Sequence, residues 1–475
     1  MMNITPLSII IIYFVLIIFI SWFTRRNIST FKQYVLADRK VGSFLLSFTM
    51  LATYIGGGTL IGITGRIFNT GISCYWIFAF AGLSFILMGY LGRKLREKEK
   101  FSLPELIEGS FGEKNKYLVA FIVIVAISCF MGVQLKTAGI VMSNITNIPE
   151  DYAIIIICGV VVLYTIFGGL LADIVTDALQ LMIIILALIL SSFYIYNTIG
   201  GFQALKGILS QVTVYGPNKY FAVFGQGTNI ISTIMLFFGT LMLVGLTIFT
   251  DPALQQRIYA AKDTNTVKRA GLFAGISYMV LGLLIVFIAI EGGAILGAEV
   301  EGEQIFPNLA LEFLPPILGG LLLAALLSAA MSTLDSDFLL LSTILVNDYY
   351  RKKINPKAND KELLYLSRIL IFLFGIFSLI LAWVSSSVLD LLQTTWILLV
   401  APIAIPIFCI IFGKGNSSGA TLSILGGFVS AIFVLIIFRV DPIQYFLVCV
   451  LISAIGMIIG TNIRKYTRGQ SERDI

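Results

Sequence analysis

The stretch Ser328-Ala-Ala-Met-Ser-Thr-Leu-Asp-Ser-Asp337 lies in the middle of an apolar run from about residue 317 to residue 346. A run of this length is sufficient to cross a bilayer as a helix. Six of the ten side chains nevertheless carry a hydroxyl or a carboxylate. A carboxylate inside a membrane costs at least about 2.5 kcal/mol unless another group compensates it. The stretch therefore indicates a membrane helix with a cation bound or close by.

Helical geometry places four residues of this stretch on one stripe, because positions i, i+3, i+4 and i+7 stack on one face. They are Ala329, Ser332, Thr333 and Ser336. Hydroxyl and carbonyl oxygens are hard ligands, which suit a small alkali cation. The alternative is that the hydroxyls only bond to the preceding turn or to neighbouring helices. Asp335 and Asp337 in the same turn favour the ion, so we expect this helix to hold one.

Composition assigns the chain to the polytopic α-helical membrane proteins. Of its 475 residues, 58% are hydrophobic and 12% are charged, with a mean hydropathy of +0.96, a balance foreign to soluble domains of this size. The absence of histidine excludes histidine-dependent zinc sites and Ser-His-Asp triads. The basic residues lie in short loops, so the net charge of +6 does not indicate a nucleic-acid partner. We expect no enzymatic activity and no organic cofactor.

Apolar segments separated by loop signals predict about thirteen membrane spans. Their expected boundaries are 4–23, 41–68, 73–92, 117–143, 152–170, 173–197, 229–250, 271–296, 316–346, 368–387, 389–412, 418–438 and 443–462. We expect one transmembrane domain over residues 1–475. Most Lys and Arg residues fall in alternate loops, so the positive-inside rule predicts an external N-terminus and a cytoplasmic C-terminus in a cell membrane.

Three successive glycines interrupt the second predicted span, in Thr53-Tyr-Ile-Gly-Gly-Gly-Thr59. Each destabilises a helix by about 1 kcal/mol relative to alanine, and backbone freed inside a membrane must be satisfied internally or line a polar cavity. The alternative is close helix packing, which small residues allow. The flanking threonines favour a broken helix.

A second interruption is expected at Gly239-Thr240, inside the seventh predicted span. The two expected breaks begin successive five-helix blocks at about 41–197 and 229–412, with an additional helix before them and two after, at 418–462. Such an arrangement predicts an inverted repeat, in which substrate and ion bind near the membrane midplane between the broken helices.

Two further membrane charges have two interpretations each. Asp177 either takes part in an ion site or complements the helix dipole in the first turns of its span. Lys136 either extends toward the outer membrane surface or provides a counter-charge to a substrate carboxylate or to an intramembrane Asp.

Several segments together resemble the sodium:solute symporter family over about residues 25–413. They are Tyr34-Val-Leu-Ala-Asp-Arg39, Ser102-Leu-Pro-Glu105, Phe167-Gly-Gly169, Thr176-Asp-Ala-Leu-Gln180, Asp251-Pro-Ala-Leu-Gln-Gln-Arg257 and Ala329-Ala-Met-Ser-Thr333. The Gly-Gly-Gly span, the Ser-x-x-Asp-Ser pattern and the loop Asn359-Asp-Lys-Glu362 are similar to the branch that contains choline transporters. The resemblance implies a LeuT-type fold of about thirteen helices with a five-plus-five inverted repeat. It also implies sodium-coupled symport of a small molecule by alternating access.

The resemblance implies one or two sodium sites. The first would use carbonyls of Ala52, Ile55 and Ala329 with the hydroxyls of Ser332 and Thr333. The second would use the residues Asp177, Ser332 and Ser336. Asp335 stands where other members have Ser, and could join the second site or take up a proton.

Choline-type members surround the quaternary ammonium with aromatic rings. Tyr54 and Phe130 match two such positions, but Asp251 stands in place of a Trp and Lys136 adds positive charge. We therefore expect a carboxylate-bearing solute: an amino acid, a monocarboxylate, pantothenate or an acidic sugar. The candidate substrate residues are Thr53, Tyr54, Gly56, Gly57, Thr59, Phe130, Gln134, Lys136, Phe237, Gly239 and Thr240.

Other functions stay open at this point. A choline or quaternary-amine transporter and a transport-inactive sensor share the expected fold. An intramembrane protease could be built on Asp177 and Asp335, although the usual GxGD context is missing. A passive channel would rarely need two interrupted helices. The expected partners are the lipid bilayer and the small-molecule substrate, with the monomer as the functional unit.

Overall fold

The computed structural model describes residues 4–212, 221–223, 230–297, 300–384, 388–435 and 442–471. In this part of the chain all regular secondary structure is helical, which confirms the expected all-α membrane fold. The α-helices are α1 (Ile4–Thr24), α2 (Phe31–Leu36), α3 (Ser43–Tyr54), α4 (Thr64–Thr70), α5 (Tyr75–Leu91), α6 (Arg93–Arg96), α7 (Leu103–Phe111), α8 (Glu113–Thr146), α9 (Glu150–Ile199), α10 (Phe202–Val212), α12 (Ile230–Thr250), α13 (Pro252–Ala260), α14 (Thr264–Leu296), α15 (Ile305–Asn308), α16 (Pro316–Thr343), α17 (Asp360–Val384), α18 (Val388–Phe412), α19 (Ser417–Phe433) and α20 (Pro442–Ser471).

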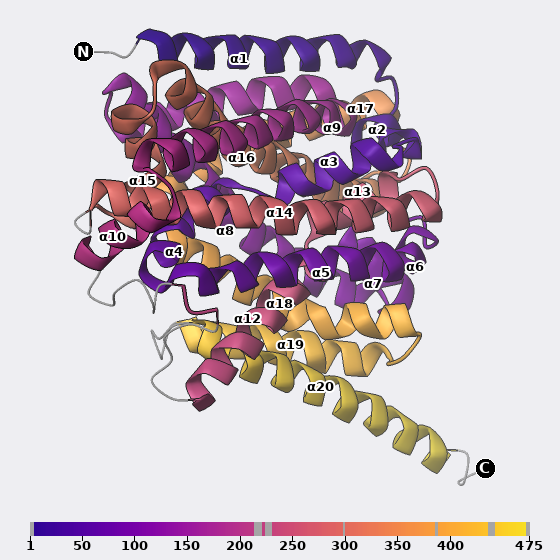
Figure 1. The fold of residues 1–475 in the computed structure, drawn as a ribbon. Coiled ribbons are helices and arrows are strands. Elements are labelled where there is room, and N and C mark those ends of the chain that lie inside the picture. The colour runs from indigo at the N-terminus through magenta and orange to yellow at the C-terminus, as the bar shows by residue number, and fades with distance from the viewer. Residues whose placement is uncertain are drawn as a thin grey trace.

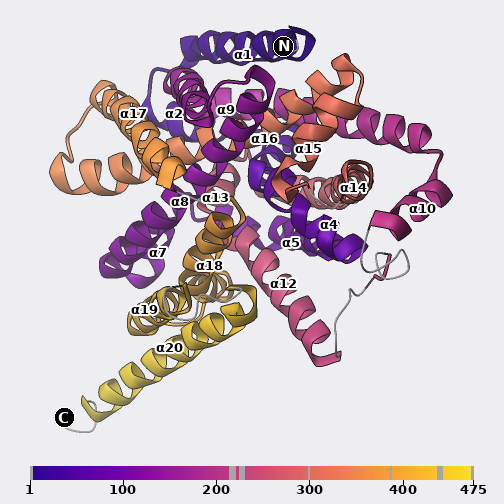
Figure 2. The same ribbon diagram turned by 90° about the vertical axis from the view of Figure 1, so that its left-hand side faces the viewer.

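The long helices run side by side, and short helices lie at both ends of the bundle (Figure 1). The start of α1 lies at the same end as α10 and α15, whereas α6, α7 and α13 lie at the opposite end, toward which α20 runs. Seen along the bundle, α16 is central and α1, α17 and α20 lie at the periphery (Figure 2). The peripheral helices expose large apolar side chains such as Phe19 and Ile458, as contact with lipid requires.

Nine helices in the described part of the chain are long and apolar enough to span a membrane, or up to ten with one bent pair. The expected count of thirteen is therefore not confirmed. Helix α9 alone is 50 residues long and covers two of the expected spans. It is kinked at Gly169, whose φ of 55° and ψ of −164° lie outside the helical region and suit glycine. A Cβ there would also come within 2.6 Å of Tyr34.

Helix α16 is buried on all sides, which is typical of the core helix of a large bundle. Every residue from Leu322 to Thr343 is buried. The helix packs against α8, α9 and α1. Its hydroxyls and carboxylates therefore face protein and not lipid, and they must find partners on these neighbouring helices.

The second span is broken at the three glycines, as predicted. Helix α3 ends at Tyr54, and the chain resumes as a π-helical turn, η3 (Gly58–Gly62), with a bend of 51° between the two parts. Close packing also applies at this point. A Cβ on Gly57 would lie 2.5 Å from Cγ2 of Thr137 on α8. The glycines therefore allow both the bend and the approach of α8.

The expected interruption at Gly239-Thr240 is wrong, because α12 is continuous across both residues; their side chains lie outside the described part of the structure. A single glycine costs a helix only about 1 kcal/mol relative to alanine, which packing of a long apolar helix readily offsets. The chain instead leaves the helix at Asp251, whose side chain caps α13.

Candidate functional site

Ser332 and Thr333 of α16 face the last turn of α3. The Ser332 hydroxyl lies 3.1 Å from the Ala52 carbonyl and 3.1 Å from the Ala329 carbonyl. The Thr333 hydroxyl lies 3.0 Å from the Thr53 carbonyl and 3.2 Å from that of Ala329. Three carbonyls and two hydroxyls therefore form one buried cluster of hard oxygen ligands, of the kind that small alkali cations bind.

This cluster brings together four of the five residues expected at the first sodium site: Ala52, Ala329, Ser332 and Thr333. The fifth, Ile55, lies in the break itself, buried and with φ −84° and ψ 66°. Its part in an ion site stays a prediction. The carbonyl of Thr53, a residue expected to contact substrate, accepts the Thr333 hydroxyl.

Gln134 of α8 is buried beside the same break. Its Oε1 accepts a hydrogen bond of 2.8 Å from the Gly57 N–H, and since a backbone N–H can only donate, this bond fixes the orientation of the amide. Its Nε2 has no hydrogen-bond partner among the described residues. A Cβ on Gly56 would lie 3.0 Å from this Nε2 and 2.9 Å from the Thr333 hydroxyl. An amide donor is thus available directly beside the oxygen cluster.

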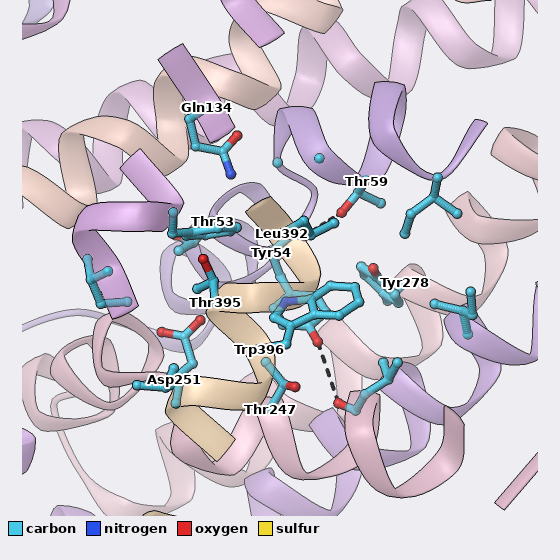
Figure 3. Close-up of a pocket in the computed structure, with 18 residues that line it drawn as sticks. Thr53, Tyr54, Thr59, Gln134, Thr247, Asp251, Tyr278, Leu392, Thr395 and Trp396 are labelled. Atoms are coloured by element: carbon cyan, nitrogen blue, oxygen red, sulfur yellow. Dashed lines mark hydrogen bonds between the residues drawn. The ribbon is translucent and has the colours of Figure 1, made fainter. Parts of the chain in front are cut away.

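A pocket lies next to the break, between α3, α8, α12, α14 and α18 (Figure 3). Its lining residues are Thr53, Tyr54, Gly56, Gly58, Thr59, Ile63, Ile77, Ile127, Phe130, Gln134, Val244, Thr247, Asp251, Tyr278, Leu392, Thr395, Trp396 and Leu399. Six of the expected substrate residues are among them: Thr53, Tyr54, Gly56, Thr59, Phe130 and Gln134. A mostly apolar pocket with a few polar groups is the usual form of a small-molecule site.

Aromatic rings and one carboxylate give this pocket its chemical character. Tyr54 and Tyr278 pack edge to face with ring centroids 5.4 Å apart, and Trp396 lines the pocket as well. Among the lining residues that the structure describes, Asp251 is the only one of an ionisable acidic or basic type, apart from the two tyrosines. It was expected only as a departure from the choline-type pattern, and the structure places it inside the pocket.

Lys136 does not line this pocket. On a helix it follows Gln134 by about 200°, so it points to the opposite face of α8, whereas Phe130 and Gln134 are one turn apart on the same face. Lys136 is half-buried, and its charge acts on Glu150 at the start of α9. This placement agrees with the outward-extending interpretation of the lysine.

Two other expected substrate residues also lie elsewhere. Gly57 packs against Thr137, and the ring of Phe237 contacts those of Trp76 and Phe80, with centroids 5.2 Å and 4.9 Å apart. Gly239 and Thr240, as noted above, fall outside the described side chains. The described lining of the pocket therefore includes none of the three residues expected on α12, and contains Val244 and Thr247 of that helix.

Arg257 of α13 bonds to two of the ligands expected for a second sodium, Asp177 and Ser336. Its Nη2 lies 2.9 Å from Asp173, 3.0 Å from Asp177 and 2.5 Å from the Ser336 hydroxyl. Its Nε donates to the Thr49 hydroxyl at 2.7 Å. The guanidinium is completely buried. A tethered cation thus already sits where the resemblance implied a bound ion.

Asp335 adds a third carboxylate to this cluster. Oxygens of Asp173, Asp177 and Asp335 all lie within 4.8 Å of one another. Oδ1 of Asp335 accepts the backbone N–H of Ser336 at 2.8 Å, whereas its Oδ2 has no hydrogen-bond partner within the described ranges. With one guanidinium against three carboxylates, the cluster has fewer positive than negative groups, a difference that protons or a further cation would compensate.

Three residues of the pocket and of the carboxylate cluster were not predicted as site residues from the sequence. They are Asp173, Arg257 and Asp251. Asp173 precedes Asp177 by one helical turn and therefore lies on the same face, a spacing that could have revealed it. Arg257 and Asp251 stand in a segment that was interpreted as a cytoplasmic loop, where charges are ordinary. The short capped helix α13 carries Arg257 back into the protein.

Comparison with known proteins identifies the family. The model of the sodium:solute symporter family matches residues 34–427. The high-affinity proline transporter PutP of Bacillus subtilis (strain 168) is 29% identical over 392 residues, which cover 79% of this chain and 80% of that protein. Sodium/proline symporter 2 of Staphylococcus saprophyticus is 25% identical over 450 residues, or 91% of this chain and 85% of that one.

The fold agrees with this result. A solved structure of a Na⁺-coupled sialic acid symporter, in a substrate-bound outward-open state, matches with a TM-score of 0.82 at 16% identity, over 97% of both chains. The family match spans most of the sequence, and proteins named sodium/proline symporters are among the relatives. The expected family is confirmed: this chain belongs to the sodium:solute symporter family.

Proposed function

We propose that this chain imports a small carboxylate-bearing solute together with sodium across the cell membrane, by alternating access. The observation that carries the proposal is the buried oxygen cluster on Ser332 and Thr333. The cluster lies directly beside a pocket that holds the amide donor of Gln134, which has no partner among the described residues. A carboxylate bound there would meet both a cation and an N–H group. The relatives named for proline and the neighbour named for sialic acid transport solutes of this chemical kind.

The coupling ion is proposed to bind at Ala52, Ile55, Ala329, Ser332 and Thr333. The hydroxyls of Ser332 and Thr333 now bond to backbone carbonyls, and rotation about one bond would turn their lone pairs to an ion. A second sodium at Asp177, Ser332, Ser336 and Asp335 would have to share Asp177 and Ser336 with Arg257. We therefore expect one sodium per substrate while Arg257 is in place. The proposed functional unit is the monomer.

A quaternary-amine substrate is a second candidate, because two arguments against it do not hold. Lys136 lies outside the pocket, and Asp251 lies inside it together with Tyr54, Tyr278 and Trp396. An acid and aromatic faces attract a cation. A substrate that carries both a carboxylate and a cationic nitrogen would satisfy this observation and the first proposal together.

Substitution of the two hydroxyls tests the sodium site. Ser332→Ala and Thr333→Ala should each raise the sodium concentration needed for half-maximal uptake in proteoliposomes by about tenfold, because each removes one ligand worth about 1–2 kcal/mol. Ser342→Ala is the matched control. Ser342 is buried in the same helix, and its hydroxyl bonds to its own helix at Leu339.

Uptake by the unaltered protein that proceeds equally well without sodium would overturn sodium coupling. Equal sodium dependence in Ser332→Ala, Thr333→Ala and Ser342→Ala would leave the coupling intact but move the ion site elsewhere. Potassium replaces sodium in these titrations, so that ionic strength is constant.

A further inference from the structure

We infer that Asp251 recognises a positively charged nitrogen of the substrate, so that the transported solute is a zwitterion and not a simple monocarboxylate or acidic sugar. The inference rests on the proposed function, because it takes the pocket at the break in α3 as the substrate site. It adds that the end of this pocket at Asp251 selects a positively charged nitrogen.

Asp251 lies at one end of the pocket and Gln134 at the other (Figure 3). Oδ1 of Asp251 accepts the N–H groups of Ala253 and Leu254, at 2.8 and 3.0 Å, and thereby caps α13. Its Oδ2 takes part in no hydrogen bond within the described structure. The carboxylate therefore keeps one oxygen for a ligand while its position is fixed by the helix that it caps.

Two threonine hydroxyls near Asp251 donate their protons to carbonyls of their own helices. Thr247, one turn before Asp251, donates its proton to the Leu243 carbonyl at 2.6 Å. Thr395 on α18 donates to the Leu391 carbonyl at 3.0 Å. Because a hydroxyl has one proton, both side chains present only lone pairs to the pocket. A carboxylate flanked by acceptors is complementary to a cationic N–H group.

The Gln134 end has the opposite polarity. Its Oε1 is held by the Gly57 N–H at 2.8 Å, which leaves the two N–H bonds of its Nε2 for a ligand, and the proposed sodium site adjoins it through Thr333. A substrate carboxylate fits this end. The pocket as a whole thus has a donor end and an acceptor end, which suits one orientation of a zwitterion.

The protein itself supplies no cation for Asp251 inside the pocket. No Lys or Arg is among the lining residues that the structure describes. Arg257 influences Asp251 electrostatically, but its hydrogen bonds go to Thr49, Asp173 and other groups of the α9 cluster. A neutral or anionic substrate group at this end would leave a carboxylate uncompensated, which is costly in an apolar site.

Matched ligand pairs test the inference in detergent-purified protein by calorimetric binding in sodium. L-Proline and cyclopentanecarboxylate differ only by the ring nitrogen, and L-alanine and propionate differ only by the ammonium group. Choline supplies a cation without a carboxylate. We expect the zwitterion of at least one pair to bind about tenfold to over a hundredfold more tightly than its partner, the value of a charge-assisted hydrogen bond.

Asp251→Asn removes the charge but keeps the cap, since Asn is as good an N-cap as Asp. It should weaken binding of the zwitterion by the same factor and leave the monocarboxylate unchanged or tighter, whereas Asp251→Glu should restore part of the loss. Asp263→Asn is the matched control. Asp263 caps α14 in the same way, with a bond of 2.7 Å to the Thr266 N–H, and does not line the pocket.

Each outcome has a separate meaning. Equal binding of both members of every pair, or equal losses for both in Asp251→Asn, would overturn the zwitterion inference and leave the proposed function standing. Binding of choline alone, lost in Asp251→Asn, would support the role of Asp251 and overturn the carboxylate in the proposed function. If no probe shows sodium-dependent binding, the result counts against both the zwitterion inference and the proposed function.

Discussion

Arg257 supplies positive charge to the carboxylate cluster between α9 and α16. Its guanidinium bonds to two carboxylates and to Ser336 and is completely buried. Loss of one partner of a buried ion pair costs about 3–5 kcal/mol, because a buried charge is left without compensation. Sodium is small enough to take the place of the guanidinium among the same oxygens.

We expect Arg257→Gln to lower the thermal stability of the detergent-purified protein in potassium, and sodium to restore a larger part of it than in the unaltered protein. The reason is that Asp173 and Asp177 then need a new counter-ion. Unfolding curves in a sodium series at constant ionic strength measure both effects. Lys353→Gln removes a surface pair with Glu113 and serves as control, with an effect of about 0–1 kcal/mol. If sodium stabilises Arg257→Gln no more than it stabilises the unaltered protein, sodium does not replace the guanidinium in this cluster.

At the scale of elements, the contact between the broken helix and α8 sets the geometry of the pocket. The backbone of Gly57 is in the ordinary helical region, with φ −57° and ψ −38°, so glycine is needed there for space alone. An added Cβ would lie 2.5 Å from Cγ2 and 2.9 Å from Cβ of Thr137, and 3.0 Å from Ala330 on α16. The turn at the break would have to move away from both helices.

Gly57→Ala should therefore reduce sodium-coupled uptake by about tenfold or more, because displacement of this turn also displaces the Gly57 N–H from Gln134. Overpacking of this kind costs about 1–3 kcal/mol, which thermal unfolding will show. Gly159→Ala is the control, since nothing lies within 4 Å of a Cβ at that position. Adding Thr137→Ala to Gly57→Ala removes the nearest atom and should recover part of the uptake. Failure of this recovery, or normal uptake in Gly57→Ala, would show that the contact does not position the site.

At the scale of the whole molecule, the predictable features are those that the bilayer imposes on a single segment. Apolar runs predict helices because every backbone group in lipid must bond within its own segment, and three glycines together predict the break in α3. The isolated Gly239 in α12 does not predict a break, since packing outweighs its cost. The approach of Ser332 to Ala52, 280 residues apart, and of Arg257 to Asp173, 84 apart, depends on how the helices assemble. The first contact was expected through the family resemblance, whereas the second had no signal beyond the spacing of Asp173 and Asp177.

The orientation of the molecule in the membrane is a further property of the whole chain. The basic segment of α6 lies at one end of the bundle, and α10 with the start of α1 lies at the other (Figure 1). Because basic loops stay in the cytoplasm, we expect the α10 end to face outward.

Labelling of single cysteines tests this orientation, in a background without the half-buried Cys129 and Cys409. A membrane-impermeant maleimide should label Ser210→Cys, which is exposed on α10, in intact cells. It should label Lys98→Cys, exposed beyond α6, only after the membrane is opened. The reverse pattern would invert the assignment, and with it the direction in which the sodium gradient drives the solute through the pocket.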